Sequence, residues 1–152
     1  MAKVEQTLFT VGVFQDLAWA ERGVEALRQL GFTADVMTLV AKDGPETASF
    51  VQKVLGDGPE RLDLPNIGPA LGKGSLVGVL QGRSRDLAKV GIAGAITRAG
   101  FQAHDGLIYE TLTGRGGVLV AIEDPARASD ALAALLSYGG GNAAIGAWAG
   151  RV

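Results

Sequence analysis

The amino-acid sequence predicts one mixed α/β domain whose strands and helices follow the order β-α-β-β-α-β. Residues 7–42 have the pattern strand-helix-strand, and residues 118–136 have the pattern strand-helix. Between these blocks lies a Gly-rich stretch, residues 64–101, which must join them because neither block is large enough to fold alone. With 152 residues, 47% of them hydrophobic, the chain can bury a core without disulfides or a structural metal.

The first block has regular patterns. Thr7–Phe14 has apolar side chains on both faces, as expected for a strand in a sheet that is covered on both sides. Asp16 is a suitable N-cap for an amphipathic helix that Gly31 ends, and its apolar stripe is formed by Leu17, Ala20, Val24 and Leu27. Asp35–Lys42 is then the second strand, and the three elements have the size of a crossover unit.

The next part of the chain is less regular. Pro45 favours a short helix at Glu46–Leu55, and the polar residues that follow, up to Pro65, predict an exposed loop. Asn66–Gly72 is the weakest of the predicted strands. Because it contains a proline, we expect it at an edge of the sheet or at a bulge.

Three helices are expected after this strand. Ser75 and Asp86 can cap helices at Leu76–Gln81 and Leu87–Ala99, and another helix follows at Ala103–Thr113. The middle helix carries small residues on one face, which would let another backbone approach closely: Ala88, Gly91, Ala95 and Ala99.

The last part of the chain divides into a domain and a tail. Val118–Glu123 is a continuous apolar run, so we expect it to be a central strand and the last strand of the sheet. Pro125 opens a C-terminal helix. We therefore expect a single domain at residues 1–138, followed at residues 139–152 by a Gly-rich hinge and a short apolar tail without a stable register.

Three segments resemble one bacterial family when taken in this order: VGVFQDLAWAERGVEALRQLGF, IGPALGKGSLVGVL with VGIAGAITRAGF, and YETLTGRGGVLVAIEDPARASDALAALL. The chain is similar to the heat-induced general stress protein domain family over about residues 7–138, most specifically at Tyr109-Glu110 and Gly116–Val120. This resemblance implies a ferredoxin-like α/β sandwich with extra helices inserted before the last strand and with a C-terminal helix. It brings no catalytic residues, because the function of the family is unknown.

Composition argues against several classes of function. A formal net charge of −2 without a basic run argues against a nucleic-acid partner. The N-terminal residues lack the apolar core of a signal peptide, and no segment has the roughly 20 strongly apolar residues of a membrane span. The chain has no cysteine, which removes disulfides and thiolate chemistry and fits a reducing compartment. We expect a cytoplasmic protein that binds neither nucleic acid nor a membrane.

Motifs that carry chemistry are weak. Gly72-Lys73-Gly74-Ser75 departs from the spacing of a phosphate-binding loop and is more simply a turn with a helix cap. His104 and Asp105 have the residue types of an acid–base pair, but Asp105 fits better as a first-turn carboxylate of a helix. The acidic residues at 57–63 have no histidine partners for a metal site. We expect no catalytic, cofactor-binding or metal-binding residues and no cofactor.

The apolar tail is the strongest candidate for a binding segment. It follows a Gly-rich hinge, and Ile145, Trp148 and Arg151 are residue types that can dock in a groove or add to a sheet edge of a partner. The alternative is that the tail folds back onto its own domain or onto a second copy.

These observations and the resemblance predict a non-catalytic, stress-associated interaction module. We expect a homodimer or a higher homo-oligomer, formed through a sheet face or through the small-residue helices. One alternative is a cargo or adaptor protein whose tail docks on a partner. Another is a small-molecule-binding protein or an enzyme, with a pocket between the sheet and the inserted helices near Lys73, His104 and Arg115.

Overall fold

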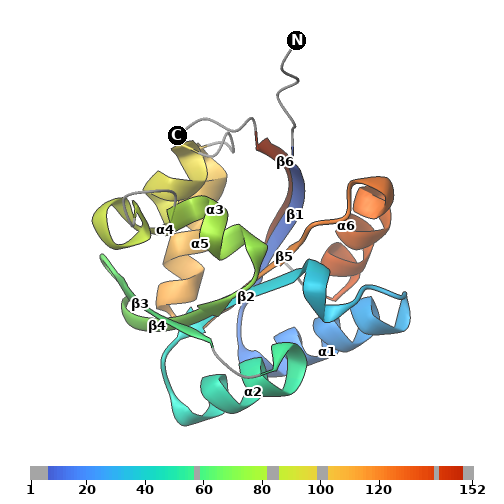
Figure 1. Cartoon of the computed structure of the whole chain (residues 1–152), viewed down its shortest axis with the longest axis horizontal. Helices are drawn as coiled ribbons and strands as arrows, with labels where there is room; N and C mark the ends of the chain where they lie inside the picture. The colour runs from blue at the N-terminus through green and yellow to red at the C-terminus, as the bar shows by residue number, and fades with distance from the viewer. Residues whose placement is uncertain (1–6, 57–58, 82–85, 99–102, 139–140, 149–152) are drawn as a thin grey trace.

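A computed structural model describes residues 7–56, 59–81, 86–98, 103–138 and 141–148. Within these residues the chain is a mixed α/β structure built around one antiparallel sheet of six strands (Figure 1). The strand order is β3-β4-β2-β5-β1-β6. The strands are β1 (Thr7–Phe14), β2 (Met37–Lys42), β3 (Glu60–Leu64), β4 (Gly68–Lys73), β5 (Val118–Ile122) and β6 (Gly141–Trp148).

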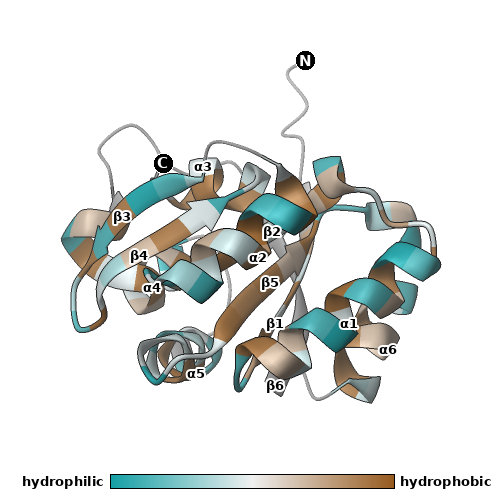
Figure 2. Cartoon of the chain, turned by 90° about the horizontal axis from the view of Figure 1, so that it is seen from below, coloured by the Kyte–Doolittle hydropathy of each residue, from teal (hydrophilic) through white to brown (hydrophobic). Residues whose placement is uncertain are grey.

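Helices cover both faces of the sheet. One face carries α1 (Leu17–Gln29), α2 (Pro45–Leu55) and α6 (Ala128–Ser137). The other face carries α3 (Ser75–Gln81), α4 (Asp86–Arg98) and α5 (Ala103–Gly114). Figure 2 shows the hydrophobic strand β5 passing through the middle of the molecule, between these helices.

Side chains of the central strands alternate between two hydrophobic cores. In β5, Leu119 and Ala121 belong to the core beneath α3, α4 and α5, whereas Val118, Val120 and Ile122 belong to the core beneath α1, α2 and α6. All five are buried. Strands covered on both sides need apolar residues on both faces, so the continuous apolar runs predicted the burial correctly even though the sheet is antiparallel.

The end of the chain differs from the prediction. β5 is central, as predicted, and pairs with β1 and β2, but it is not the last strand. Residues 141–148 form β6 and pair with β1 from Thr7↔Trp148 to Val13↔Gly141. The helix expected at the C-terminus, α6, therefore connects β5 to β6. The prediction of a separate tail is wrong for residues 141–148, because pairing with β1 gives this Gly- and Ala-rich segment a register.

A hairpin replaces the loop that was predicted before Pro65. β3 pairs with β4 and buries Leu62 and Leu64. The weak predicted strand is thus not at an edge, since β4 has β3 on one side and β2 on the other. Its proline is tolerated because Pro69 lies at the end of the pairing with β2, where it contributes its carbonyl oxygen, which accepts from the N–H of Asp43 at 3.0 Å.

The predicted small-residue helix is broken at Gly91. Its φ of 73° and ψ of −176° are not helical, so α4 consists of two helical parts. Close approach occurs within the chain, because a Cβ added at Gly106 of α5 would lie 3.0 Å from the carbonyl oxygen of Ala93 in α4. The chain's own helices also cover both faces of the sheet. Of the small residues offered for self-association, Gly91 and Ala95 are buried, Ala88 is exposed, and Ala99 lies outside the described residues.

Tyr109 and Glu110 connect this helical layer to the rest of the molecule. The N–H of Ala93, just after the break in α4, donates to Oε1 of Glu110 at 3.2 Å, and Nδ2 of Asn66 donates to Oε2 at 3.4 Å. Glu110 thus caps a helical segment that begins at a glycine, which has no side chain of its own. The Tyr109 hydroxyl donates to the carbonyl oxygen of Val11 at 3.3 Å. Burial raises the pKa of Tyr109 well above its usual value.

Candidate interaction surfaces

The segment Gly72–Ser75 has a structural role. Gly74 has a φ of 126°, and a Cβ added there would collide with Oγ1 of Thr38. The N–H of Leu76 donates to that Oγ1 at 3.1 Å, so Thr38, and not the predicted Ser75, caps α3. The glycine at position 74 allows the backbone to pack closely on β2. This arrangement is that of a packed turn and differs from an open phosphate-binding loop.

The residues considered for catalysis lie at the ends of different elements. Lys73 ends β4, His104 is exposed in the first turn of α5, and Arg115 follows the end of α5. None of the three lines the grooves described below. Within the described ranges, no group of three His, Cys, Asp or Glu side chains is arranged to hold a metal ion.

The predicted docking residues lie in or beyond β6. The backbones of Ile145 and Trp148 pair with Thr10 and Thr7 of β1, and Arg151 lies outside the described residues. Docking of this segment on a partner stays a prediction. It now concerns an edge strand instead of a free peptide.

The two edges of the sheet differ in charge. β3 has the sequence ERLDL, in which three of five residues are charged. β6 has the sequence GNAAIGAW, with no charged residue and no proline among eight. Charges and prolines at a sheet edge prevent pairing with another chain. The edge at β3 is protected in this way, and the edge at β6 is not.

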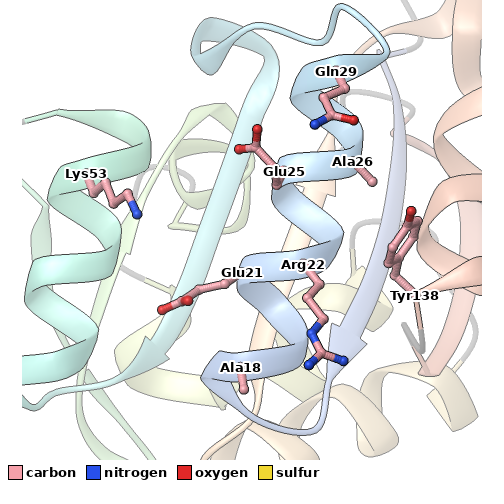
Figure 3. A pocket seen from close by; sticks show the side chains of 8 residues that line it. All are labelled: Ala18, Glu21, Arg22, Glu25, Ala26, Gln29, Lys53 and Tyr138. Carbon is pink, nitrogen blue, oxygen red and sulfur yellow. The ribbon is translucent and has the colours of Figure 1, made fainter.

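A second candidate surface is a groove along the outer face of α1, with a volume of about 670 Å³ (Figure 3). Residues of α1 form its middle, Lys53 of α2 lies on one side, and Tyr138 at the end of α6 lies on the other. Another groove, of about 340 Å³, continues between α1 and α6 and shares Ala26, Gln29 and Tyr138 with the first. The outer face of α1 is therefore the centre of one continuous surface.

Charged and aromatic residues on α1 are unpaired or exposed. Glu21 and Glu25 are one turn apart, a spacing at which like charges destabilise a helix. Neither these carboxylates nor Arg28 makes an ion pair among the residues that the structure describes. The guanidinium of Arg22 lies 5.2 Å from the ring centroid of Trp19, which is 37% exposed. Tryptophan, tyrosine and arginine carry much of the binding energy in protein interfaces.

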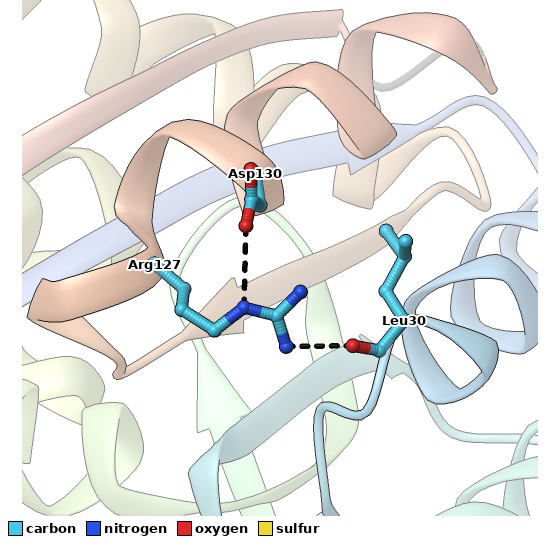
Figure 4. Close-up of polar contacts among 3 residues, drawn as sticks. All are labelled: Leu30, Arg127 and Asp130. Carbon is cyan, nitrogen blue, oxygen red and sulfur yellow. Dashed lines mark hydrogen bonds and ion pairs between the residues drawn. The ribbon is translucent and has the colours of Figure 1, made fainter.

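Arg127 fixes α6 against the end of α1 (Figure 4). Its Nη1 donates to the carbonyl oxygen of Leu30 at 2.6 Å, and its Nε lies 3.2 Å from Oδ2 of Asp130. The guanidinium also lies 4.4 Å from the ring centroid of Phe32. Arg127 thus binds a carbonyl left open at the C-terminus of α1, where a positive charge is favourable. This contact joins residues 97 positions apart, and no sequence pattern predicted it.

Comparison with known proteins gives no identification. No protein-family model, no curated protein and no solved structure matches the chain. The resemblance to the general stress family therefore stays a prediction. Among the described helices, none is long and apolar enough to cross a membrane.

Proposed function

We propose that this protein is a non-catalytic interaction module that self-associates by pairing β6 with β6 of a second copy. The observation that carries this proposal is the uncharged, proline-free sequence of β6 at one end of the sheet, in contrast to the charged strand β3 at the other end. An edge strand offers backbone N–H and C=O groups to another strand. Antiparallel pairing about a two-fold axis would satisfy these groups in both copies.

The arrangement of the strands supports a more detailed view of the fold. We infer that β1, α1, β2, β5, α6 and β6 form a ferredoxin-like β-α-β-β-α-β unit. Its four strands are neighbours in the order β2-β5-β1-β6, and α1 and α6 pack on the same face. The segment from α2 to α5 is then an insertion between the second and third strands of the unit. This insertion extends the sheet beyond β2, so the edge of the sheet next to β2 is covered and β6 is the uncharged edge strand at the other end.

The expected strength of this contact is moderate. Each intermolecular hydrogen bond contributes about 0.5–1.5 kcal/mol net. A contact along the whole of β6 is therefore expected to support association in roughly the micromolar range. The stress association rests on the family resemblance, and the abundance of the protein after heat shock tests it.

Two adjacent proline substitutions, Ala144→Pro and Ile145→Pro, test the strand contact. Neighbouring N–H groups in a strand point to opposite sides, so one of these residues donates towards β1 and the other towards the open edge. We expect one variant to lower the melting temperature. The other should keep the melting temperature while its mass, measured by light scattering after size-exclusion chromatography, falls below that of the wild-type chain.

A charged variant tests the same strand contact without the risk that a proline unfolds the strand. Ala144→Lys puts a charge on the edge strand, and charges at an edge oppose pairing with another chain, so this variant should also have a lower mass. Asp63→Lys on β3 is the matched control and should leave the mass unchanged. A wild-type chain that is monomeric at micromolar concentration, or folded β6 variants with the wild-type mass, would show that the proposal is wrong.

The adaptor hypothesis uses the same strand with a different partner. If β6 pairs with a strand of another protein, the β6 variants keep the mass of the wild-type chain, and the edge-facing proline variant loses that partner in a pull-down. The effect of the β6 variants on the mass of the purified chain therefore separates the two functions.

A further inference from the structure

We propose that the outer face of α1 is a second interface, which takes α1 of a second copy in antiparallel orientation. This inference goes beyond the β6 contact and does not depend on it. It rests on the charges along α1, which complement themselves when the helix is reversed.

The outer stripe of α1 has the spacing of a coiled-coil seam. Ala18, Arg22, Glu25 and Gln29 are separated by four, three and four positions, and all are exposed. They lie opposite the buried face of the helix, which is formed by Ala20, Gly23, Val24 and Leu27. A stripe of this kind can pack against a second helix at an axial distance of about 8–10 Å.

Reversal of the helix about its midpoint pairs opposite charges along this stripe. When two copies of α1 lie antiparallel, Arg22 of one faces Glu25 of the other, and the same contact occurs a second time by symmetry. Ala18 then faces Gln29, which brings no charge conflict. The ends and the middle of the stripe are therefore compatible with a second copy.

The residues beside the stripe also match. In an antiparallel pair about a two-fold axis, each flank of one helix meets the same flank of the other. On the flank next to α2, Glu21 of one copy therefore faces Arg28 of the other. On the flank next to α6, Trp19 faces the small residue Ala26. The contacts with Arg22 and Arg28 would relieve the repulsion between Glu21 and Glu25 within each copy.

Charge favours a second copy over other partners. The groove contains two acidic residues, Glu21 and Glu25, and two basic residues, Arg22 and Lys53, so a partner with one sign of charge meets repulsion. Exposed ion pairs contribute only about 0–1 kcal/mol each. They therefore determine the orientation, while burial of the aromatic side chains of Trp19 and Tyr138, now 37% and 39% exposed, supplies the affinity.

Charge reversal on α1 tests this interface. Arg22→Glu and Glu25→Arg each place like charges opposite each other twice, so we expect the dissociation constant, measured by sedimentation, to rise at least about tenfold. The double variant Arg22→Glu/Glu25→Arg restores the opposite charges and should recover the wild-type value. All variants are made in the Ala144→Lys background, so that the measured mass reports on the α1 contact.

Mixing the single variants separates an interface from an effect within one helix. An equimolar mixture of the Arg22→Glu and Glu25→Arg chains brings opposite charges together at both positions, so the mixture should associate more tightly than either chain alone. Arg115→Glu, an exposed charge reversal outside α1, is the control and should have no effect. Circular dichroism shows whether each variant is folded.

The outcomes distinguish this proposal from the β6 contact. If the charge reversals leave the dissociation constant unchanged, if neither the double variant nor the mixture recovers association, or if the Ala144→Lys chain is a monomer, the α1 interface is wrong. The effect of the β6 variants on the wild-type mass is a separate result, and it decides the strand contact alone.

Discussion

At the scale of single residues, Gly91 and Glu110 depend on each other. Glycine permits the φ of 73° and ψ of −176° at which α4 breaks, a conformation that is almost confined to glycine and costs other residues about 1–3 kcal/mol. A Cβ at position 91 would also lie 2.5 Å from Oε1 of Glu110. Glu110 is only 9% exposed, and it uses this oxygen to cap the helical segment after the break. The pair therefore sets the direction in which α4 continues.

Gly91→Ala should lower the free energy of unfolding by about 2–3 kcal/mol, because it adds both backbone strain and a collision with the carboxylate. Gly78→Ala is the matched control in α3, where no atom lies within 4 Å of the added Cβ. The control should raise the free energy of unfolding by about 0.5–1 kcal/mol, as expected for alanine in a helix. Urea denaturation measures both, and equal effects would contradict this explanation.

At the scale of elements, the position of α6 relative to α1 depends on Arg127. Its bonds to Leu30 and Asp130 both lie at the surface but differ in kind, and the ion pair with Asp130 joins side chains that are 35% and 60% exposed. Water screens such a pair, whereas the hydrogen bond to Leu30 satisfies a helix terminus. We therefore expect the contact with Leu30 to contribute more to the stability of the fold than the ion pair.

Arg127→Ala should lower the free energy of unfolding by about 1.5–3 kcal/mol, the usual range for a hydrogen bond to a charged group. Asp130→Ala removes only the exposed ion pair, and its effect should be below about 1 kcal/mol. Denaturant titration of both variants tests this order. A larger loss for the aspartate variant would assign the role to the ion pair.

At the scale of the whole molecule, β6 completes the sheet. Its partner β1 carries the buried residues Phe9, Val11 and Val13, and loss of β6 would leave this apolar strand at an edge. Two different two-fold contacts on one chain, at β6 and at α1, would also generate assemblies larger than a dimer.

A chain that ends at Tyr138 should melt at a lower temperature than the full chain and should aggregate, because β1 becomes an unprotected edge. Thermal unfolding and light scattering measure the two effects. A free tail would predict the opposite result, namely an unchanged melting temperature for the shortened chain.

Much of the fold could be predicted from patterns among residues that are close together in the sequence. Asp16 caps α1 as predicted, with the N–H of Trp19 donating to Oδ1 at 2.9 Å. Gly31 follows the end of α1 with a φ of 96°, and β5 is buried at the centre of the sheet. Caps, helix-ending glycines and continuous apolar runs depend on residues a few positions apart, so their effects can be recognised in a sequence.

The remaining features were decided only by tertiary structure, because their partners are far away in the sequence. Thr38 caps a helix that begins at Ser75, and Arg127 binds the carbonyl of Leu30. Glycine and alanine have weak strand preference, so nothing local marks residues 141–148 as a strand. Their register exists because β1 offers an open edge, and this same pairing turned the predicted free tail into the edge through which we expect the protein to associate.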